Sequence, residues 1–180
     1  MPFIRSISGL RATLDNSLTP VIVTLYAGAF EQYLPPGEII VGRDGRPSGK
    51  WIEELIARTL SIRGRTVHLL GIVPTPTVQL LVEHTPNAVG GISITASHNP
   101  SEWNGMKFMG SDGVFLDAAE NQAFWKFADG VQSQEKSTQK GEIIHRVDAI
   151  EQHIKRLLDI SVFSDETLDA IRKRKYKVVV

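Results

Sequence analysis

The sequence predicts an α/β protein, a three-layer α/β/α sandwich built around a mixed, mostly parallel sheet. Short β-forming segments alternate with amphipathic helical segments of about 10–15 residues along most of the chain. The long crossovers between successive strands favour parallel pairing, since a helix is needed to return the chain to the same end of the sheet. Hairpin-like returns at residues 5–15 and 106–115 add antiparallel strands, so we expect a mixed sheet.

Cap residues and prolines predict where the helices begin and end. Thr19-Pro20 places an N-cap residue before a proline at the first helical position, and Pro35-Pro36-Gly37 ends that helix. Ser48 is expected to cap a second helix, which Arg63-Gly64 closes. Thr75-Pro76 repeats the cap and proline for a third helix. Apolar residues recur at helical spacing in these segments.

Strands and one further helix fill the remainder of this region. Strands are predicted between the helices at residues 38–41, 66–70 and 88–94. Asp117 and Glu120 form a capping box for a fourth helix that ends near Gly130. The polar segment 131–141 is predicted to be a surface loop or linker.

The C-terminal part is predicted to contain two helices. The first is amphipathic, with its apolar residues on one face: Ile150, Ile154, Leu157 and Leu158. Ser164 caps the second, which ends in the basic run 172–175. We interpret this run as a solvated helix end that complements the helix dipole, not as a nucleic-acid site. Residues 176–180 resemble the start of a strand. We therefore expect one domain over residues 1–175 and the start of a truncated following domain at 176–180.

Composition limits the classes of function. Lysine plus arginine and aspartate plus glutamate are balanced at 20 each, so the charge gives no reason to expect nucleic acid or an anionic membrane as a partner. The chain has no cysteine, which excludes disulfides, thiolate metal sites and cysteine nucleophiles. No apolar run approaches the roughly 20 residues of a membrane span. We expect a cytoplasmic protein.

The most informative segment is residues 91–100, where β-forming residues lead into a small polar loop that contains Ser97. Asn99-Pro100 closes the loop, and Asn104-Gly105 is predicted to turn the chain and return Lys107. If the two segments form a hairpin, the apolar neighbours of Lys107 face the core and Lys107 lies on the side of the Ser97 loop. A hydroxyl nucleophile beside a cation is suited to accepting and donating a phosphoryl group.

Two arginine-containing turns are candidate anion sites. Residues 41–49 join a strand to a helix N-terminus, where free amides and the helix dipole attract anions, and Arg43 and Arg46 add positive charge. The alternative is a tight structural turn in which Asp44 pairs with an arginine. Arg11 follows a glycine turn, and its planar guanidinium either lies at the surface or contacts phosphate.

The pair Ser97-His98 raises the alternative of a serine hydrolase, which we disfavour. Neighbouring residues of an extended chain point to opposite sides, so His98 would be poorly placed to deprotonate Ser97. The Gly-x-Ser-x-Gly elbow is absent, and the other histidines are scattered without metal-ligand spacing.

Several of these residues resemble a known family in combination. Residues 95–100, followed by 104–107, resemble the active-site phosphoserine loop of the α-D-phosphohexomutases, which include phosphomannomutase/phosphoglucomutase and phosphoglucosamine mutase. Residues 8–11, 41–49 and 71–76 are similar to further family segments in the expected order. The resemblance covers roughly residues 7–115, and the tail from residue 131 carries no motif of the family.

The resemblance implies an α/β domain that is the first of four, and an enzyme that moves phosphate between two positions of a hexose phosphate. Ser97 would be the phosphoserine, which donates its phosphoryl group to form a sugar bisphosphate and is then rephosphorylated. Arg11, His98 and Lys107 would line the reacting centre, and Lys107 is the better candidate for the general acid and base.

The resemblance also implies partners outside this chain. Arg43, Arg46 and Asn99 are expected to contact substrate or phosphate. One Mg²⁺ would lie between the phosphate of Ser97 and aspartates of a second domain, and no such aspartate loop occurs in this sequence. We therefore expect the isolated chain to fold without turning over hexose phosphates. The alternative is a non-catalytic phosphosugar-binding module, which would have no use for Ser97.

Overall fold

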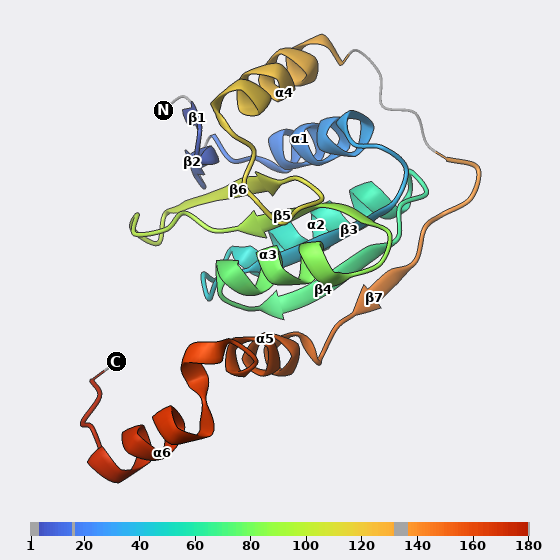
Figure 1. The fold of residues 1–180 in the computed structure, drawn as a ribbon. Helices are drawn as coiled ribbons and strands as arrows, with labels where there is room; N and C mark the ends of the chain where they lie inside the picture. Colours follow the sequence, from blue (N-terminus) through green and yellow to red (C-terminus); the bar gives the residue numbers. More distant parts are fainter. Residues whose placement is uncertain (1–3, 16, 132–136, 180) are drawn as a thin grey trace.

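The structure, a computed structural model, describes residues 4–15, 17–131 and 137–179 (Figure 1). Its strands form one seven-stranded sheet with the order β1-β2-β6-β5-β3-β4-β7. Their bounds are β1 (Ile4–Ser6), β2 (Gly9–Thr13), β3 (Glu38–Arg43), β4 (Val67–Ile72), β5 (Ala88–Ile94), β6 (Trp103–Met109) and β7 (Ile143–His145).

The sheet is mixed, as the sequence predicts. β3 pairs in parallel with both β5 and β4, and β4 pairs in parallel with β7. The β1–β2, β2–β6 and β5–β6 pairs are antiparallel. These pairings give β2, β3, β4, β5 and β7 one direction and β1 and β6 the opposite one. The predicted return at residues 5–15 forms the β1–β2 pair, and the return at 106–115 forms an isolated antiparallel bridge between Met109 and Phe115.

Helices cover both faces of the sheet (Figure 1). Their bounds are α1 (Pro20–Tyr33), α2 (Gly49–Ser61), α3 (Thr75–His84), α4 (Ala118–Gly130), α5 (Ala149–Leu158), the 3₁₀ helix η1 (Ser161–Phe163) and α6 (Asp165–Arg174). One buried cluster joins α1, α2 and α4 to the sheet through residues such as Phe30, Ile56 and Phe124. A second cluster joins α3 and the start of α5 to the opposite face through Leu81 and Ala149. The three-layer sandwich is therefore confirmed.

The caps of α1 and α4 are confirmed. The Thr19 hydroxyl accepts a hydrogen bond from the Ile22 amide at 3.3 Å. Asp117 and Glu120 each accept a hydrogen bond from the other's backbone amide at 2.8 Å, which completes the capping box. Each cap satisfies amides that have no partner inside the helix.

Ser48 takes the predicted N-cap position of α2 without making a capping hydrogen bond, whereas the predicted cap at Thr75 is wrong. Ser48 precedes α2, but its hydroxyl accepts a hydrogen bond from the Asn104 side chain at 2.8 Å and none from a helix amide. Thr75 lies inside α3, with Pro74 as the N-cap, and its hydroxyl is 3.1 Å from that of Ser93. In both cases a partner distant in sequence binds the hydroxyl that local spacing assigns to a cap.

The segment after α4 contains a strand that the sequence analysis does not predict. β7 pairs with β4, with His68 opposite Ile144. Part of the predicted loop 131–141 lies outside the described residues, and the described residues 137–141 form neither helix nor strand. A three-residue strand is too short to show a period of two, so only its tertiary pairing identifies it.

Residues 149–179, here called the C-terminal arm, extend from the β7 edge of the sheet (Figure 1). His153 Nδ1 lies 2.7 Å from the Thr77 hydroxyl and links α5 to α3. The predicted apolar face of α5 is largely exposed: Ile150 is 40%, Ile154 52%, Leu157 41% and Leu158 46% accessible. The predicted Ser164 cap of α6 is confirmed, since its hydroxyl accepts from the Thr167 amide at 3.2 Å.

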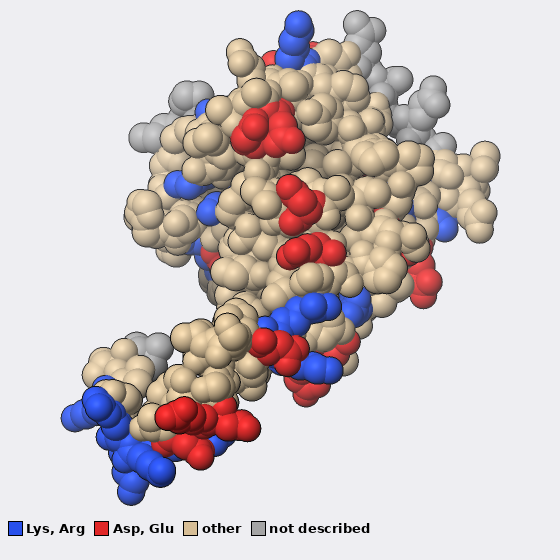
Figure 2. Space-filling view, viewed as in Figure 1, with Lys and Arg blue, Asp and Glu red and all other residues tan. Residues whose placement is uncertain are grey.

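The end of the C-terminal arm is solvated. Residues 172–175 are exposed, and Figure 2 shows blue side chains gathered on α6 at the lower left. Residues 176–179 are exposed and form no strand here, because a strand requires a neighbour for its backbone groups. Among the helices of the described residues, none combines the length and apolar character that crossing a membrane requires.

Candidate functional site

Residues 95–102 connect β5 to β6 and are here called the Ser97 loop. The two strands form an antiparallel hairpin in which Ile94 pairs with Met106. The Asn99 amide donates to the Ala96 carbonyl at 3.1 Å, and the Ser97 amide donates to the Thr95 hydroxyl at 3.0 Å. The chain turns within this loop. The predicted turn at Asn104-Gly105 is therefore wrong, because both residues lie inside β6.

Ser97 occupies a sparsely populated backbone conformation. Its φ is +59°, in the left-handed region that few non-glycine residues adopt. Such a conformation costs roughly 1–3 kcal/mol and persists only where surrounding contacts hold it. Ser97 and His98 are both exposed, so the loop presents a strained serine at the surface.

The left-handed backbone also brings the two neighbouring side chains together. Ser97 Oγ lies 3.5 Å from His98 Nδ1. The expectation that these side chains point to opposite sides is therefore wrong, since it assumes an extended chain. Among the described hydrogen bonds and ion pairs, none places a carboxylate on His98 to orient its ring, so the structure gives no catalytic triad.

Arg46 stabilises the backbone of the Ser97 loop by hydrogen bonds to its carbonyl groups. The guanidinium donates to the carbonyls of Ser97 at 3.0 Å and Asn99 at 2.7 Å. It also donates to those of Pro100 at 2.8 Å and Trp103 at 3.3 Å. Its Nε donates to Asp44 Oδ2 at 3.0 Å, and the Arg46 side chain is only 13% exposed. The pairing of Asp44 with an arginine, one of the two predicted alternatives for this turn, is present.

Arg43 is held by a buried acid on α2. Its Nε donates to Glu53 Oε2 at 3.1 Å, with the Arg43 side chain 15% and the Glu53 side chain 9% exposed. Burial raises the pKa of the Glu53 carboxyl above its ordinary value, although Arg43 opposes this shift. Both arginines of the turn thus make structural contacts. Phosphate binding by Arg43 and Arg46 stays a prediction.

Arg11 reaches the Ser97 loop from β2. Leu10 and Ala12 are fully buried, so the alternation of the strand places Arg11 on the opposite face. Its Nη1 lies 3.4 Å from Asn99 Oδ1, which brings two predicted site residues together. β2 approaches β6 closely here. A Cβ on Gly105 would lie 2.2 Å from the Leu10 carbonyl oxygen, so only glycine fits.

Lys107 lies on the same face as Arg11. Met106 and Phe108 are buried in the core, as predicted, and Lys107 pairs across the hairpin with Ser93. Its Nζ is 5.1 Å from the centroid of the Phe115 ring. Partial burial, with the positive charge of Arg11 nearby, lowers the pKa of the Lys107 amine below its ordinary value.

Asn104 is a positioning residue that sequence reasoning misassigns. It is fully buried, and its Nδ2 donates to the Ser48 hydroxyl at 2.8 Å while its Oδ1 accepts from the Gly105 amide at 2.8 Å. This contact joins the start of β6 to the start of α2. The pair Asn-Gly is a strong turn signal, and only the tertiary partner reveals the other role.

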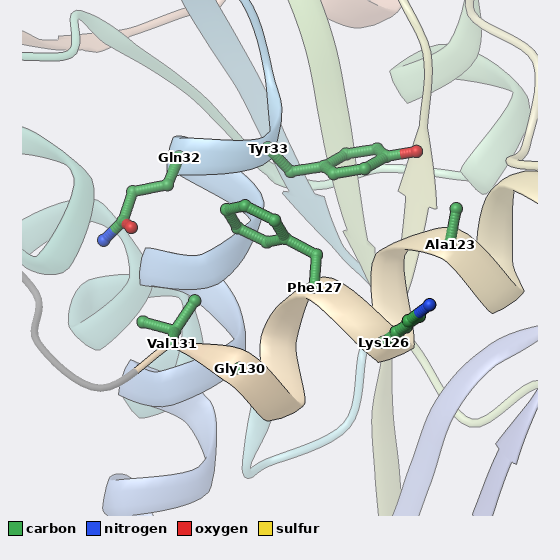
Figure 3. Close-up of a pocket in the computed structure, with 7 residues that line it drawn as sticks. All are labelled: Gln32, Tyr33, Ala123, Lys126, Phe127, Gly130 and Val131. Carbon is green, nitrogen blue, oxygen red and sulfur yellow. The ribbon is translucent and has the colours of Figure 1, made fainter.

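An open groove on another part of the surface is separate from the Ser97 loop. It has a volume of about 750 Å³ and is lined by Gln32, Tyr33, Ala123, Lys126, Phe127, Gly130 and Val131. Figure 3 shows Phe127 of α4 directed toward the end of α1, and its ring centroid is 5.7 Å from that of Tyr33. No predicted site residue lines this groove.

Side chains that bind metal ions are not clustered in the part of the chain that the structure describes. Among them there is no group of three or more histidine, aspartate or glutamate side chains that could hold a metal ion. Ser97 is the metal ligand that the sequence analysis predicts from this chain, and a phosphate on its exposed hydroxyl could supply oxygen ligands.

Comparisons with known proteins agree with this architecture. The family model "Phosphoglucomutase/phosphomannomutase, alpha/beta/alpha domain I" matches residues 4–135. A probable phosphoglucosamine mutase of Methanopyrus kandleri is 33% identical over 159 residues, which are 88% of this chain and 35% of that protein. A phosphoglucosamine mutase of Deinococcus radiodurans is 42% identical over 118 residues, which are 62% of this chain and 26% of that protein.

A solved structure gives the same result. The putative phosphomannomutase of Thermus thermophilus superposes with a TM-score of 0.74 and 27% identity, covering 90% of this chain and 37% of that one. The chain thus spans between a quarter and about a third of the length of these relatives. Because the family model covers most of the chain, including the Ser97 loop, this chain belongs to the phosphoglucomutase/phosphomannomutase family and carries its α/β/α domain I.

Proposed function

We propose that this chain is the phosphoserine-bearing domain of a phosphohexomutase, in which Ser97 donates and accepts the phosphoryl group. One observation carries the proposal: Ser97 is exposed, its backbone φ lies in the left-handed region, and Arg46 binds the backbone of its loop. Family membership and the names of the relatives, phosphoglucosamine mutase and phosphomannomutase, support hexose phosphates as the substrate class.

The reaction consists of two transfers. In the first, the bond between phosphorus and Ser97 Oγ breaks, and phosphorus bonds to a sugar hydroxyl oxygen. The proton of that hydroxyl passes through a base to Ser97 Oγ, which leaves free serine and a hexose bisphosphate. In the second, the reoriented bisphosphate returns its other phosphoryl group to Ser97, and the serine proton passes to the sugar oxygen.

Lys107 is our candidate for the group that carries these protons. A general base must be neutral before it accepts a proton, and the lowered pKa of Lys107 increases its neutral fraction at a given pH. Arg11 remains charged and supplies electrostatic stabilisation for the transferring phosphoryl group. We place His98 and Asn99 at the same centre, with Asn99 tied to Arg11.

Other parts of the proposed enzyme lie outside this chain. We propose that the sites for Mg²⁺ and the hexose phosphate are completed by domains that follow in the relatives, since this chain spans a minor part of their length. When bound, the metal neutralises charge on the phosphate. The isolated chain should therefore fold but show no turnover in a coupled mutase assay with added Mg²⁺. Clear turnover would contradict this expectation.

The test of the proposal is made on the complete gene product. It is incubated with a hexose 1,6-bisphosphate and Mg²⁺, and intact-mass and peptide analysis locate any phosphate. We expect one phosphoryl group on Ser97 and none in the Ser97→Ala variant. A protein that binds hexose phosphate but never acquires this group would instead be a non-catalytic phosphosugar-binding module.

A further inference from the structure

We infer that Arg46 is a positioning residue for phosphoryl transfer at Ser97, and that it acts through the backbone of the Ser97 loop without touching phosphate. The inference rests on the proposed function of Ser97. It differs from the prediction that Arg46 contacts phosphate, and it assigns to this arginine a role in the geometry of the nucleophile.

The hydrogen bonds of Arg46 account for its whole donor capacity. A guanidinium carries five N–H groups. Nε donates to Asp44, Nη1 to the carbonyls of Pro100 and Trp103, and Nη2 to those of Ser97 and Asn99. Five donors thus meet five acceptors. In this arrangement Arg46 has no N–H group left for a phosphate oxygen.

The same contacts explain how the left-handed Ser97 is maintained. Two of the four carbonyls belong to Ser97 and Asn99, on either side of His98. A planar guanidinium that binds both fixes the orientation of the peptide units around the serine. Asp44 holds the guanidinium in turn, and its Oδ1 accepts the backbone amide of Arg46 at 3.0 Å.

The contacts also orient charge. Four carbonyl oxygens point toward the guanidinium of Arg46, which is largely buried, whereas Ser97 and His98 are exposed. The partial negative charges of these four oxygens are therefore offset by hydrogen bonds to the cationic guanidinium. A phosphate on Ser97 carries about −1.5 to −2 charges at neutral pH, so reduced repulsion from these oxygens favours the phosphorylated state.

Lysine cannot reproduce this geometry. Its ammonium group is a compact charge with three donors on one nitrogen, whereas the four carbonyls and Asp44 are bound by three separate nitrogens of Arg46. Arg46→Lys therefore keeps the positive charge and removes the planar three-nitrogen group that binds the carbonyls and Asp44. Arg46→Ala removes both.

The chain contains a matched control in Arg65. Its Nε donates to Glu31 Oε1 at 2.9 Å. Its two terminal nitrogens donate to four backbone carbonyls, that of Glu31 at the end of α1 and those of Leu34, Pro35 and Gly37 in the turn between α1 and β3. The Arg65 side chain is 10% exposed, close to the 13% of Arg46. Arg65→Lys thus makes the same chemical change away from the Ser97 loop.

The experiment measures three quantities for the wild type, Arg46→Lys, Arg46→Ala and Arg65→Lys. In the complete gene product, single-turnover phosphorylation of Ser97 by a hexose 1,6-bisphosphate gives the rate of the chemical step and the apparent affinity. In the 180-residue chain, hydrogen–deuterium exchange compares residues 97–103 with residues 34–38. Thermal unfolding of each variant reports general stability.

We expect Arg46→Lys to slow the chemical step by about 10- to 100-fold, because a misplacement near 1 Å has an effect of that order. Affinity should change less than threefold, and exchange should rise only at residues 97–103. Arg65→Lys should raise exchange at 34–38, lower thermal stability, and leave the transfer rate within about twofold of wild type.

Three results would overturn the inference: a wild-type transfer rate in Arg46→Lys, an equal slowing in Arg65→Lys, or a loss confined to affinity. The last would indicate direct phosphate binding. If the wild type itself acquires no phosphate, the proposed function fails separately. In that case, unchanged hydrogen–deuterium exchange at residues 97–103 in both Arg46 variants would reject the positioning role as well.

Discussion

Two turns of this molecule are each stabilised by one arginine, but only one of them carries a candidate nucleophile. At the turn between α1 and β3, Arg65 binds one carboxylate and four backbone carbonyls. At the Ser97 loop, Arg46 does the same with Asp44 and four other carbonyls. In both cases one guanidinium supplies hydrogen-bond donors to backbone carbonyls in and beside a turn.

The difference lies in what each arginine holds. The turn under Arg65 contains Pro35, Pro36 and Gly37, which favour a turn by themselves, and it carries no nucleophile. The loop over Arg46 holds a non-glycine residue at positive φ and exposes its hydroxyl. The same hydrogen-bonding pattern thus supports a plain connection at one site and a strained, exposed serine at the other.

The largest expected effect comes from Ser97→Ala. This change keeps every carbonyl that Arg46 binds and removes only the hydroxyl, so the loop should remain in place while phosphoryl transfer is lost. A coupled mutase assay on the complete gene product checks the loss, and thermal unfolding checks the fold. Full activity in this variant would refute the role of Ser97.

Lys107→Met should slow the chemical step by about 10²–10⁴-fold, the usual contribution of a general acid or base. The pH dependence of the rate tests the direction of the Lys107 pKa shift. Because burial lowers the pKa of Lys107, the rate should rise with pH and level off below the ordinary lysine value of about 10.4. A change limited to substrate affinity, or a rise centred on the ordinary value, would count against this assignment.

Arg65→Ala tests the other side of the comparison. It leaves the partly buried Glu31 without its closest cation and four carbonyls without their donor, so we expect a loss of about 3 kcal/mol in the free energy of unfolding. Urea unfolding of the 180-residue chain followed by circular dichroism measures it. A stability within about 0.5 kcal/mol of wild type, the size of an ordinary surface substitution, would show that the turn needs no such support.

The smallest effect is expected for Asp117→Ala at the start of α4, away from both arginines. The loss of the capping box should cost about 1 kcal/mol, measured by the same urea unfolding. Exchange in the Ser97 loop should not change. Increased exchange there would mean that the loop follows general stability, which would weaken the distinction between the two turns.

Local patterns in the sequence were sufficient for most of the fold. The helical segments, the hairpin at residues 5–15 and the caps at Thr19, Asp117 and Ser164 depend on neighbours within a few residues, and all are confirmed. The return at 106–115 is present as a single antiparallel bridge between Met109 and Phe115. β7 is missed because it exists only through pairing with β4. The arrangement of layers follows from the alternation of strands and helices along the chain, and this alternation does not depend on any single residue.

The candidate site was predictable in its residues and less so in their contacts. Ser97, Arg11 and Lys107 stand out from the sequence, but the left-handed φ of Ser97 does not, since nothing local requires it. The partners Ser48 and Asn104 lie 56 residues apart, and those of Arg46 are up to 57 residues away. Such separations leave no periodic signal, so hydroxyl, amide and guanidinium partners become evident only in the folded chain.

We propose that Ser97 carries phosphate transiently between two positions of a sugar. The most direct test is a pulse-chase on the complete gene product, loaded with labelled phosphate from a labelled hexose 1,6-bisphosphate and then given unlabelled hexose phosphate. We expect the label to leave Ser97 and to appear in hexose bisphosphate and hexose phosphate. A label that remains on Ser97, or leaves only as inorganic phosphate, would contradict it.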